Sequence, residues 1–198
     1  MNQEEKDDTV LLFLDFETTG VDPEKDYPIE IGCIATDITA QKVFFRYESL
    51  IKFDAVQLVD NADSKKEIET WKEEYAEGFK YHKIPAAFWY ASAKGSSTVK
   101  REIEQALLRA TEGREHWILV SDNIQFEYRF MQNIYKNVYG DNWQKEWPFH
   151  YCGWDTSLLL EASGVGDPRG VPHRALADTE LVLEATREAM RILKHNQK

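Results

Sequence analysis

Cysteine is scarce in this sequence, and long apolar runs are missing from it. The two cysteines, Cys33 and Cys152, lie far apart among the 198 residues, so they form neither a disulfide framework nor a cysteine-based zinc pattern. No apolar stretch approaches the roughly 20 residues that a membrane helix needs, and residues 1–8 are too acidic and polar for a secretory signal. We therefore expect a cytoplasmic protein that does not contact a membrane.

Basic residues are also in short supply. The sequence has 24 Lys and Arg residues against 35 Asp and Glu residues, which gives a formal net charge of −11. A protein that grips long nucleic-acid duplexes needs many Lys and Arg contacts with phosphates, so this balance disfavours that class. It does not exclude a nuclease, because bound divalent cations offset acidic residues at a site. It favours short or single-stranded nucleic acids over long duplexes.

The apolar content is sufficient for a packed core. Hydrophobic residues make up 42% of the chain and aromatic residues 13%, as in ordinary folded enzymes. A length of 198 residues suits one domain, and neither an internal repeat nor a low-complexity tract divides it. We expect a flexible tail over residues 1–9 and a single domain over residues 10–195.

Short apolar segments alternate with segments of helical spacing. Strand composition is found at residues 10–16, 28–35, 42–51, 116–120 and 151–155. Helical spacing is found at residues 64–79, 99–111, 124–139, 156–162 and 176–193. Residues 84–90 predict a loop or short helix, residues 143–148 an irregular connection, and Ser97 or Thr98 a helix cap. Three early strands followed by alternating helices and strands predict an α/β sandwich with a mixed sheet.

Two carboxylates stand at the end of the first apolar segment. Asp15 and Glu17 share one face of the predicted strand, because side chains two residues apart point the same way. Two such carboxylates are costly unless a positive group lies between them, and Mg²⁺ or Mn²⁺ prefers oxygen ligands of this kind. The alternative is that the strand ends at Asp15 and its polar neighbours face water. The pair alone leaves both interpretations open.

Two further groups of residues carry suitable chemistry. His173 follows a loop rich in Gly and Pro, and Asp178 falls in the first turns of the last predicted helix. Histidine ordinarily titrates near neutrality, which suits a general base, whereas the alternative is a loop histidine beside an acid favoured at a helix N-terminus. Asn123 stands at a helix start and Glu127 one turn later. Taken alone, these two indicate only a cap and a surface carboxylate.

In this order, the three groups resemble the DEDDh group of 3′–5′ exonucleases, which includes polymerase proofreading domains, ribonuclease T and oligoribonuclease. The segments that carry the resemblance are Leu14–Gly20, Ile29–Gly32, Asn123–Glu127, Asp155–Leu160 and His173–Asp178. It extends from about residue 10 to residue 190 and is thinnest over residues 52–98. It implies a ribonuclease H-like, three-layer α/β/α sandwich with a mixed five-stranded sheet.

The resemblance also implies an activity and a site. The activity is hydrolysis of phosphodiester bonds at the 3′ end of single-stranded RNA or DNA, with release of nucleoside 5′-monophosphates. Two ions of Mg²⁺ or Mn²⁺, about 4 Å apart, are implied, with His173 as the catalytic base. The implied metal ligands are Asp15, Glu17, Glu127 and Asp178. The implied substrate-binding residues are Phe16, Thr18, Thr19, Gly20 and Asn123.

The second motif departs from the usual pattern. The family usually has Asn-x-x-Phe-Asp there, often with His before the Asn, whereas this sequence has Phe126 followed by Glu127, and Asp122 before Asn123. Either Glu127 or Asp122 could supply the carboxylate. The alternative function is a weakened or inactive exonuclease-fold protein that binds nucleic acid or a protein. The choice between RNA and DNA, which depends on contacts to the 2′-hydroxyl, and the formation of a homodimer are left open.

Overall fold

The structure of the protein is a computed structural model, described for residues 8–52, 76–111, 114, 116–166 and 174–196. Most of the predicted helix at residues 64–79, and His173, lie outside the described residues. The strands are β1 (Thr9–Thr18), β2 (Pro28–Asp37), β3 (Val43–Lys52), β4 (Lys94–Gly95), β5 (His116–Ser121) and β6 (Trp154–Asp155). The helices are α4 (Ala76–Tyr81), α5 (Ala86–Ser92), α6 (Ser96–Ala110), α7 (Ile124–Tyr139), the 3₁₀ helix η2 (Gly140–Glu146), α8 (Ser157–Ser163) and α9 (Ala175–His195).

The strands form one mixed sheet in the order β4-β3-β2-β1-β5-β6. β1, β2 and β3 pair antiparallel as a meander, and β5 joins β1 in parallel. The mixed α/β architecture is confirmed, but the described sheet has six strands and not five. The additional strand is β4, whose two residues pair with the end of β3 and are too few to produce a pattern in the sequence.

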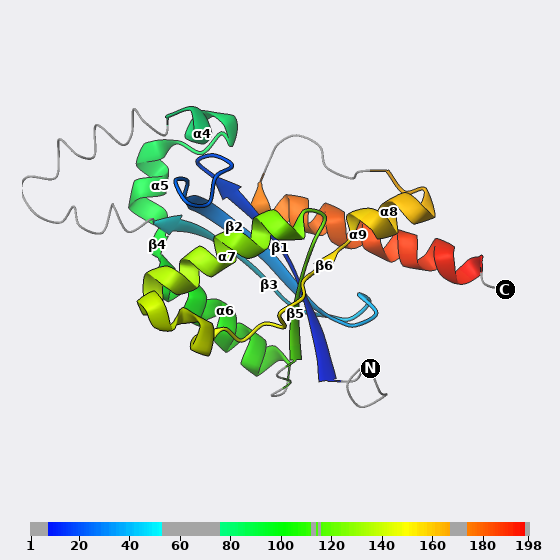
Figure 1. The fold of residues 1–198 in the computed structure, drawn as a ribbon. Helices are drawn as coiled ribbons and strands as arrows, with labels where there is room; N and C mark the ends of the chain where they lie inside the picture. Colours follow the sequence, from blue (N-terminus) through cyan, green and yellow to red (C-terminus); the bar gives the residue numbers. More distant parts are fainter. Residues whose placement is uncertain (1–7, 53–75, 112–113, 115, 167–173, 197–198) are drawn as a thin grey trace, which may run out of the picture.

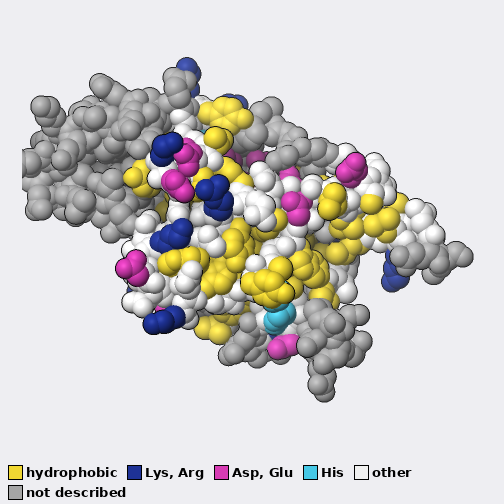
Figure 2. Space-filling view, viewed as in Figure 1, with side chains coloured by type: hydrophobic (Ala, Val, Ile, Leu, Met, Phe, Trp, Pro, Cys, Tyr) yellow, Lys and Arg dark blue, Asp and Glu magenta, His cyan; other side chains and the backbone are white. Residues whose placement is uncertain are grey.

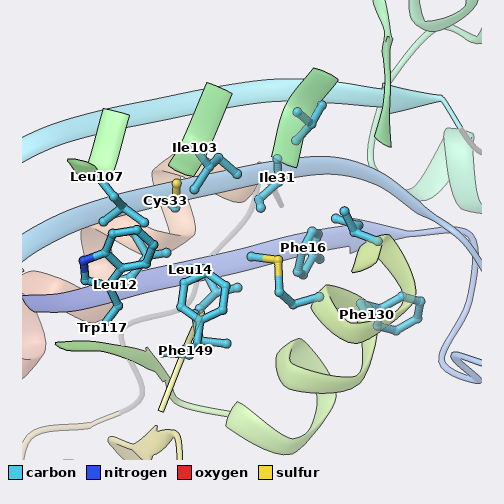
Figure 3. Close-up of a cluster of buried hydrophobic side chains, with 14 of the residues drawn as sticks. Leu12, Leu14, Phe16, Ile31, Cys33, Ile103, Leu107, Trp117, Phe130 and Phe149 are labelled. Carbon is cyan, nitrogen blue, oxygen red and sulfur yellow. The ribbon is translucent and has the colours of Figure 1, made fainter. Parts of the chain in front are cut away.

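Helices cover both faces of this sheet, with α6 and α7 on one side and α9 on the other (Figure 1). β1 lies between the two layers, which explains its nearly continuous apolar composition. Leu12, Leu14 and Phe16 join the core on the α6 and α7 side (Figure 3). Leu11 and Phe13 pack on the opposite side with residues of α9. Odd-numbered side chains of β1 therefore point toward the α9 layer.

Several local expectations were wrong. α6 begins at Ser96 with Gly95 at the cap position and no side-chain cap bond, so Ser97 and Thr98 lie inside the helix. The connection after α7 is a 3₁₀ helix that includes Trp143, where the sequence predicted an irregular segment. Of the two alternatives for residues 84–90, a loop or a short helix, the structure has the short helix, α5. None of the helices in the described ranges is long and apolar enough to cross a membrane.

Candidate active site

Three carboxylates meet at the end of β1. Asp15 and Glu17 are odd-numbered residues of β1, so their side chains point toward α9. Asp178 falls in the first turn of α9. One oxygen from each of the three carboxylates lies within 4.8 Å of the others. Residues far apart in the sequence are thus brought together on one face of the sheet, where their combined negative charge favours a cation.

The start of α9 approaches the sheet more closely than a side chain at residue 32 would permit. Gly32 on β2 pairs with Asp15, and a Cβ added there would lie 2.1 Å from the backbone nitrogen of Leu176. The hydroxyl of Thr179 donates hydrogen bonds to the carbonyl of Gly32 at 3.2 Å and to that of Ala175 at 2.7 Å. This close packing determines where Asp178 stands relative to Asp15.

A buried ion pair fixes the same helix end. Glu30 on β2 is fully buried, and its carboxylate accepts hydrogen bonds from Nε of Arg174 at 3.0 Å and from Nη2 at 2.5 Å. The backbone N–H of Ala175 donates to the same carboxylate at 3.3 Å. The hydrogen bond with Glu30 raises the pKa of Arg174 above its ordinary value. Arg174, which immediately precedes α9, is therefore bound to β2, the strand next to β1.

A cavity of about 930 Å³ opens over the three carboxylates. It is lined by Asp15, Phe16, Glu17, Thr18, Thr19, Gly20, Val21, Gly78, Tyr81, His82, Asn123, Phe126, Glu127 and Asp178. This cavity is lined by every site residue that was expected from the sequence and lies in the described part of the chain. The sequence did not indicate Val21, Gly78, Tyr81 or His82. Three of these lie in or next to α4, in the segment where the resemblance is thinnest.

Glu127 is buried beside this cavity at the start of α7. Its Oε2 accepts a hydrogen bond from the backbone N–H of Phe16 at 3.0 Å. Burial raises the pKa of the Glu127 carboxyl well above its usual value, and the negative charges of Asp15 and Asp122 raise it further. Asp122 is not among the described residues that line the cavity. The longer side chain at residue 127 therefore reaches the end of β1, although it is not in the cluster of three carboxylates.

Glu17 has one carboxylate oxygen engaged and one open. Its Oε2 lies 2.5 Å from Nδ1 of His82, a buried contact that is an ion pair when the imidazole is protonated. Its Oε1 is buried and has no hydrogen-bond partner among the described residues. A buried carboxylate oxygen without a partner is costly, and a cation held between Glu17 and its two acidic neighbours would relieve that cost. The donor set, all carboxylate oxygens, fits a hard divalent cation.

The turn after β1 is held by its own side chains. The hydroxyl of Thr18 donates to the carbonyl of Gly20 at 2.6 Å. The hydroxyl of Thr19 accepts from the backbone N–H of Tyr27 at 3.0 Å and donates to Asp26 at 3.3 Å. A Cβ on Gly20 would lie 2.5 Å from the Asp26 carboxylate. These hydroxyls shape the cavity rim by fixing the turn.

Comparison with known proteins gives matches to an exonuclease family model and to two DNA polymerases. A family model described as exonuclease matches residues 12–66. DNA polymerase III PolC-type of Thermotoga maritima is 27% identical over 186 residues, which cover 89% of this chain and 12% of that protein. The equivalent protein of Thermotoga petrophila is 27% identical over 187 residues, which cover 90% of this chain and 12% of that protein. This chain thus spans about an eighth of the length of the curated relatives it matches.

Solved structures of exonuclease I share the fold. The enzyme from Methylocaldum szegediense has a TM-score of 0.64 at 17% identity, over 92% of this chain and 40% of that one. Escherichia coli exonuclease I in complex with a dT13 oligonucleotide has a TM-score of 0.63 at 16% identity, over 94% of this chain and 43% of that one. A zinc-bound complex of the E. coli enzyme with single-stranded DNA has a TM-score of 0.60 at 15% identity, over 94% of this chain and 42% of that one.

The fold and the family match support a nuclease of the exonuclease class. Within that class, the matches support the DEDDh group that the sequence motifs resemble.

Proposed function

We propose that this chain is a metal-dependent 3′–5′ exonuclease that acts on single-stranded RNA or DNA and releases nucleoside 5′-monophosphates. The observation that carries the proposal is the meeting of Asp15, Glu17 and Asp178 within 4.8 Å at the floor of a cavity. The proposed domain is residues 10–195, because β1 and α9, near its two ends, both supply residues of this cavity.

The proposed metal ligands are the carboxylates around that floor. Asp15, Glu17 and Asp178 would hold Mg²⁺ or Mn²⁺, and Glu127, whose carboxyl lies near Asp15, would take part in holding a second ion. Divalent cations bound in this way polarise a phosphate and lower the pKa of water. The residues around them must then place the terminal phosphodiester and accept a proton.

Side chains at the cavity rim suit a terminal nucleotide. Phe126 lines the cavity and packs on Phe130, with ring centroids 4.8 Å apart. Tyr81 and Val21 are exposed at the rim. Stacking of bases on aromatic rings tolerates different sequences, so we expect little base preference. Asn123 and the Thr18–Gly20 turn would contact the terminal sugar and phosphate.

His173 is the proposed general base. Its proposed role rests on the sequence motif and on its neighbour Arg174, which is bound to Glu30 at the start of α9. It would take the proton from the water that attacks the last phosphodiester bond. Support for a single-stranded substrate comes from the related structures of E. coli exonuclease I in complex with dT13 and dA16 oligonucleotides.

A labelled substrate tests this proposal directly. Single-stranded RNA and DNA labelled at the 5′ end should be shortened in steps with Mg²⁺ or Mn²⁺, and EDTA should stop the reaction. Asp15→Ala should abolish shortening, whereas Asp141→Ala, at an exposed carboxylate on η2, should leave it unchanged. If neither nucleic acid is shortened with any divalent metal, the proposed activity is wrong.

The second-motif carboxylate can be assigned in the same assay. Glu127 lines the cavity and Asp122 does not. We expect Glu127→Ala to lower cleavage by about 10–100-fold and Asp122→Ala to have little effect. The reverse result would assign the role to Asp122. Metal binding without cleavage by the wild type would favour the alternative function, a binding module.

A further inference from the structure

His82 has no role in the site as the motifs define it, yet it lies against one of the proposed metal ligands. It follows the last residue of α4, and its backbone N–H donates to the carbonyl of Gly78 at 3.0 Å. The side chain is 10% exposed and lines the cavity. A polar ring in this position needs polar partners. Nε2 has a hydrogen-bond partner, whereas Nδ1 lies close to the carboxylate of Glu17 without a hydrogen bond among the described residues.

The ring is oriented from two sides. Nε2 lies 2.9 Å from the backbone carbonyl of Thr18. Because a carbonyl oxygen can only accept, Nε2 must be the donor in this hydrogen bond. This bond leaves Nδ1 facing Glu17, with Nδ1 and Oε2 2.5 Å apart. The contact is attractive when a proton lies between these two atoms, as it does when the imidazole carries a proton on both nitrogens. The ring of Tyr81 packs edge-on against that of His82, with centroids 5.0 Å apart. The imidazole of His82 therefore contacts both the backbone carbonyl of Thr18 and the carboxylate of Glu17 at the end of β1.

The two carboxylate oxygens of Glu17 consequently have different surroundings. Oε2 is engaged by His82, while Oε1 is buried without a hydrogen-bond partner among the described residues. The Glu17 side chain is only 5% exposed, so hydrogen bonds to water contribute little to its orientation. A side chain with several rotatable bonds loses conformational entropy when it is fixed. The contact with His82 supplies an interaction that fixes it.

We propose that His82 is a positioning residue that presents Oε1 of Glu17 to a divalent cation. This inference rests on the proposed function, because it takes Glu17 as a metal ligand. Residues that contact a ligand orient it and tune its affinity for the metal, and their loss typically costs about 10–100-fold in affinity or activity. The competing explanation is that His82 only attaches α4 to β1.

Three substitutions separate these explanations. His82→Ala removes both contacts. His82→Asn places an amide nitrogen near the position of Nδ1 and keeps a donor for Glu17, whereas His82→Gln places its amide near Nε2 and keeps only the contact with Thr18. His150→Ala is the matched control, because His150 is partly buried, contacts Cys152 and does not line the cavity.

The measurement is the affinity of the full chain for Mn²⁺ alone, by isothermal titration calorimetry, with circular dichroism to confirm folding. We expect His82→Ala and His82→Gln to weaken Mn²⁺ binding by about 10–100-fold, and His82→Asn and His150→Ala to stay close to wild type. In the cleavage assay, the Mn²⁺ concentration for half-maximal activity should rise in the same two variants, with the KM for the oligonucleotide unchanged.

Two results would overturn the inference. The first is normal Mn²⁺ affinity in His82→Ala and His82→Gln with only a lower Tm, which is the result of a purely structural role. The second is an equal loss in His82→Asn and His82→Ala, which would exclude the Nδ1 contact. If the wild type cleaves and binds Mn²⁺, either result leaves the proposed function standing. A wild type that neither binds Mn²⁺ nor cleaves overturns both.

Discussion

At the scale of single residues, Glu127 is the position where this chain differs most from the motifs it resembles. The extra methylene carries the carboxylate to the backbone N–H of Phe16, so one oxygen has a fixed partner. The same position places the carboxyl in a buried, acidic environment near Asp15 and Asp122. Ionised Glu127 is therefore unfavourable in the metal-free protein, and a cation would offset that cost.

Glu127→Gln should stabilise the metal-free protein at pH 8. The folded pKa of Glu127 is raised above its unfolded value, so the folded state holds its proton longer. Stability consequently falls as pH rises from the unfolded pKa of about 4.3 toward the folded pKa. Glutamine keeps an acceptor for the N–H of Phe16 and loses the charge. In EDTA the Tm of the variant should exceed that of wild type by at least about 2 °C at pH 8.

The control for this prediction is Glu146→Gln, at an exposed residue of η2. The Tm difference between Glu127→Gln and wild type should vanish below about pH 4, where the carboxyl is protonated in both states. A difference that stays constant across the pH range would show that it comes from packing and not from ionisation.

At the scale of helices and strands, the site depends on how α9 contacts β2. Gly32 and Glu30 lie two residues apart on the strand face that meets α9, and each contacts the first residues of the helix. Gly32 permits a close approach of the α9 backbone, and Glu30 supplies a buried charge. Both therefore determine the position of Asp178, which is one turn further along.

Gly32→Ala should damage the fold and the site together. The added Cβ would lie 2.1 Å from the backbone nitrogen of Leu176, so α9 must move. Overpacking of this kind costs about 1–3 kcal/mol and sometimes more. We expect a lower free energy of unfolding by urea denaturation and weaker Mn²⁺ binding. Gly166→Ala is the control, because its Cβ would meet nothing within 4 Å. Equal stability of the two variants would contradict the observed packing.

Arg174→Ala should be far more costly than loss of another arginine on the same helix. It leaves the fully buried Glu30 without its charged partner. Breaking a buried pair costs 3–5 kcal/mol, and because the Arg174 side chain is 44% exposed we place the loss at about 3 kcal/mol. Arg191→Ala breaks an exposed pair with Glu188, and pairs of this kind contribute little to stability because water and salt screen them. Thermal or urea unfolding measures the loss of stability in both variants. A similar loss in the two would show that Glu30 relaxes into solvent when Arg174 is removed.

The elements show what sequence patterns can and cannot predict. β1, β5 and α7 were predicted within two residues of their bounds, because continuous apolar runs and helical spacing are local signals. β4 was missed because two residues acquire strand geometry only by pairing with the end of β3. The cap of α6 was misplaced because Gly95 precedes the helix without a side-chain bond.

The site divides in the same way. Asp15, Glu17 and Asp178 were expected together because their motifs are distinctive in composition and order. His82 was not expected, because its position depends on the backbone carbonyl of Thr18 and the carboxylate of Glu17, both on β1 and more than 60 residues away in the sequence. Neither contact leaves a signal in the sequence around residue 82.

At the scale of the whole molecule, the charge distribution limits how nucleic acid can be held. On the face shown in Figure 2, hydrophobic side chains gather near the centre, and the Lys and Arg side chains of the coloured residues lie mostly to the left of them, interspersed with Asp and Glu side chains. Together with the net charge of −11, this arrangement provides few phosphate contacts.

Binding of single-stranded DNA should therefore depend weakly on salt. Each phosphate contact contributes a slope of about −0.7 to log K against log salt for single strands, so we expect a slope no steeper than about −2. Fluorescence anisotropy of a labelled oligonucleotide across a KCl series, with the Asp15→Ala variant to prevent cleavage, measures it. A much steeper slope would contradict the small number of phosphate contacts expected here.

The distance along the chain between Asp15 and Asp178 has a consequence for biosynthesis. The strand that bears the first two carboxylates leaves the ribosome early, whereas α9 follows all six described strands. The chain would carry a half-built acidic site until α9 has emerged and docked on Gly32. The three carboxylates would therefore come together only after translation has passed this helix.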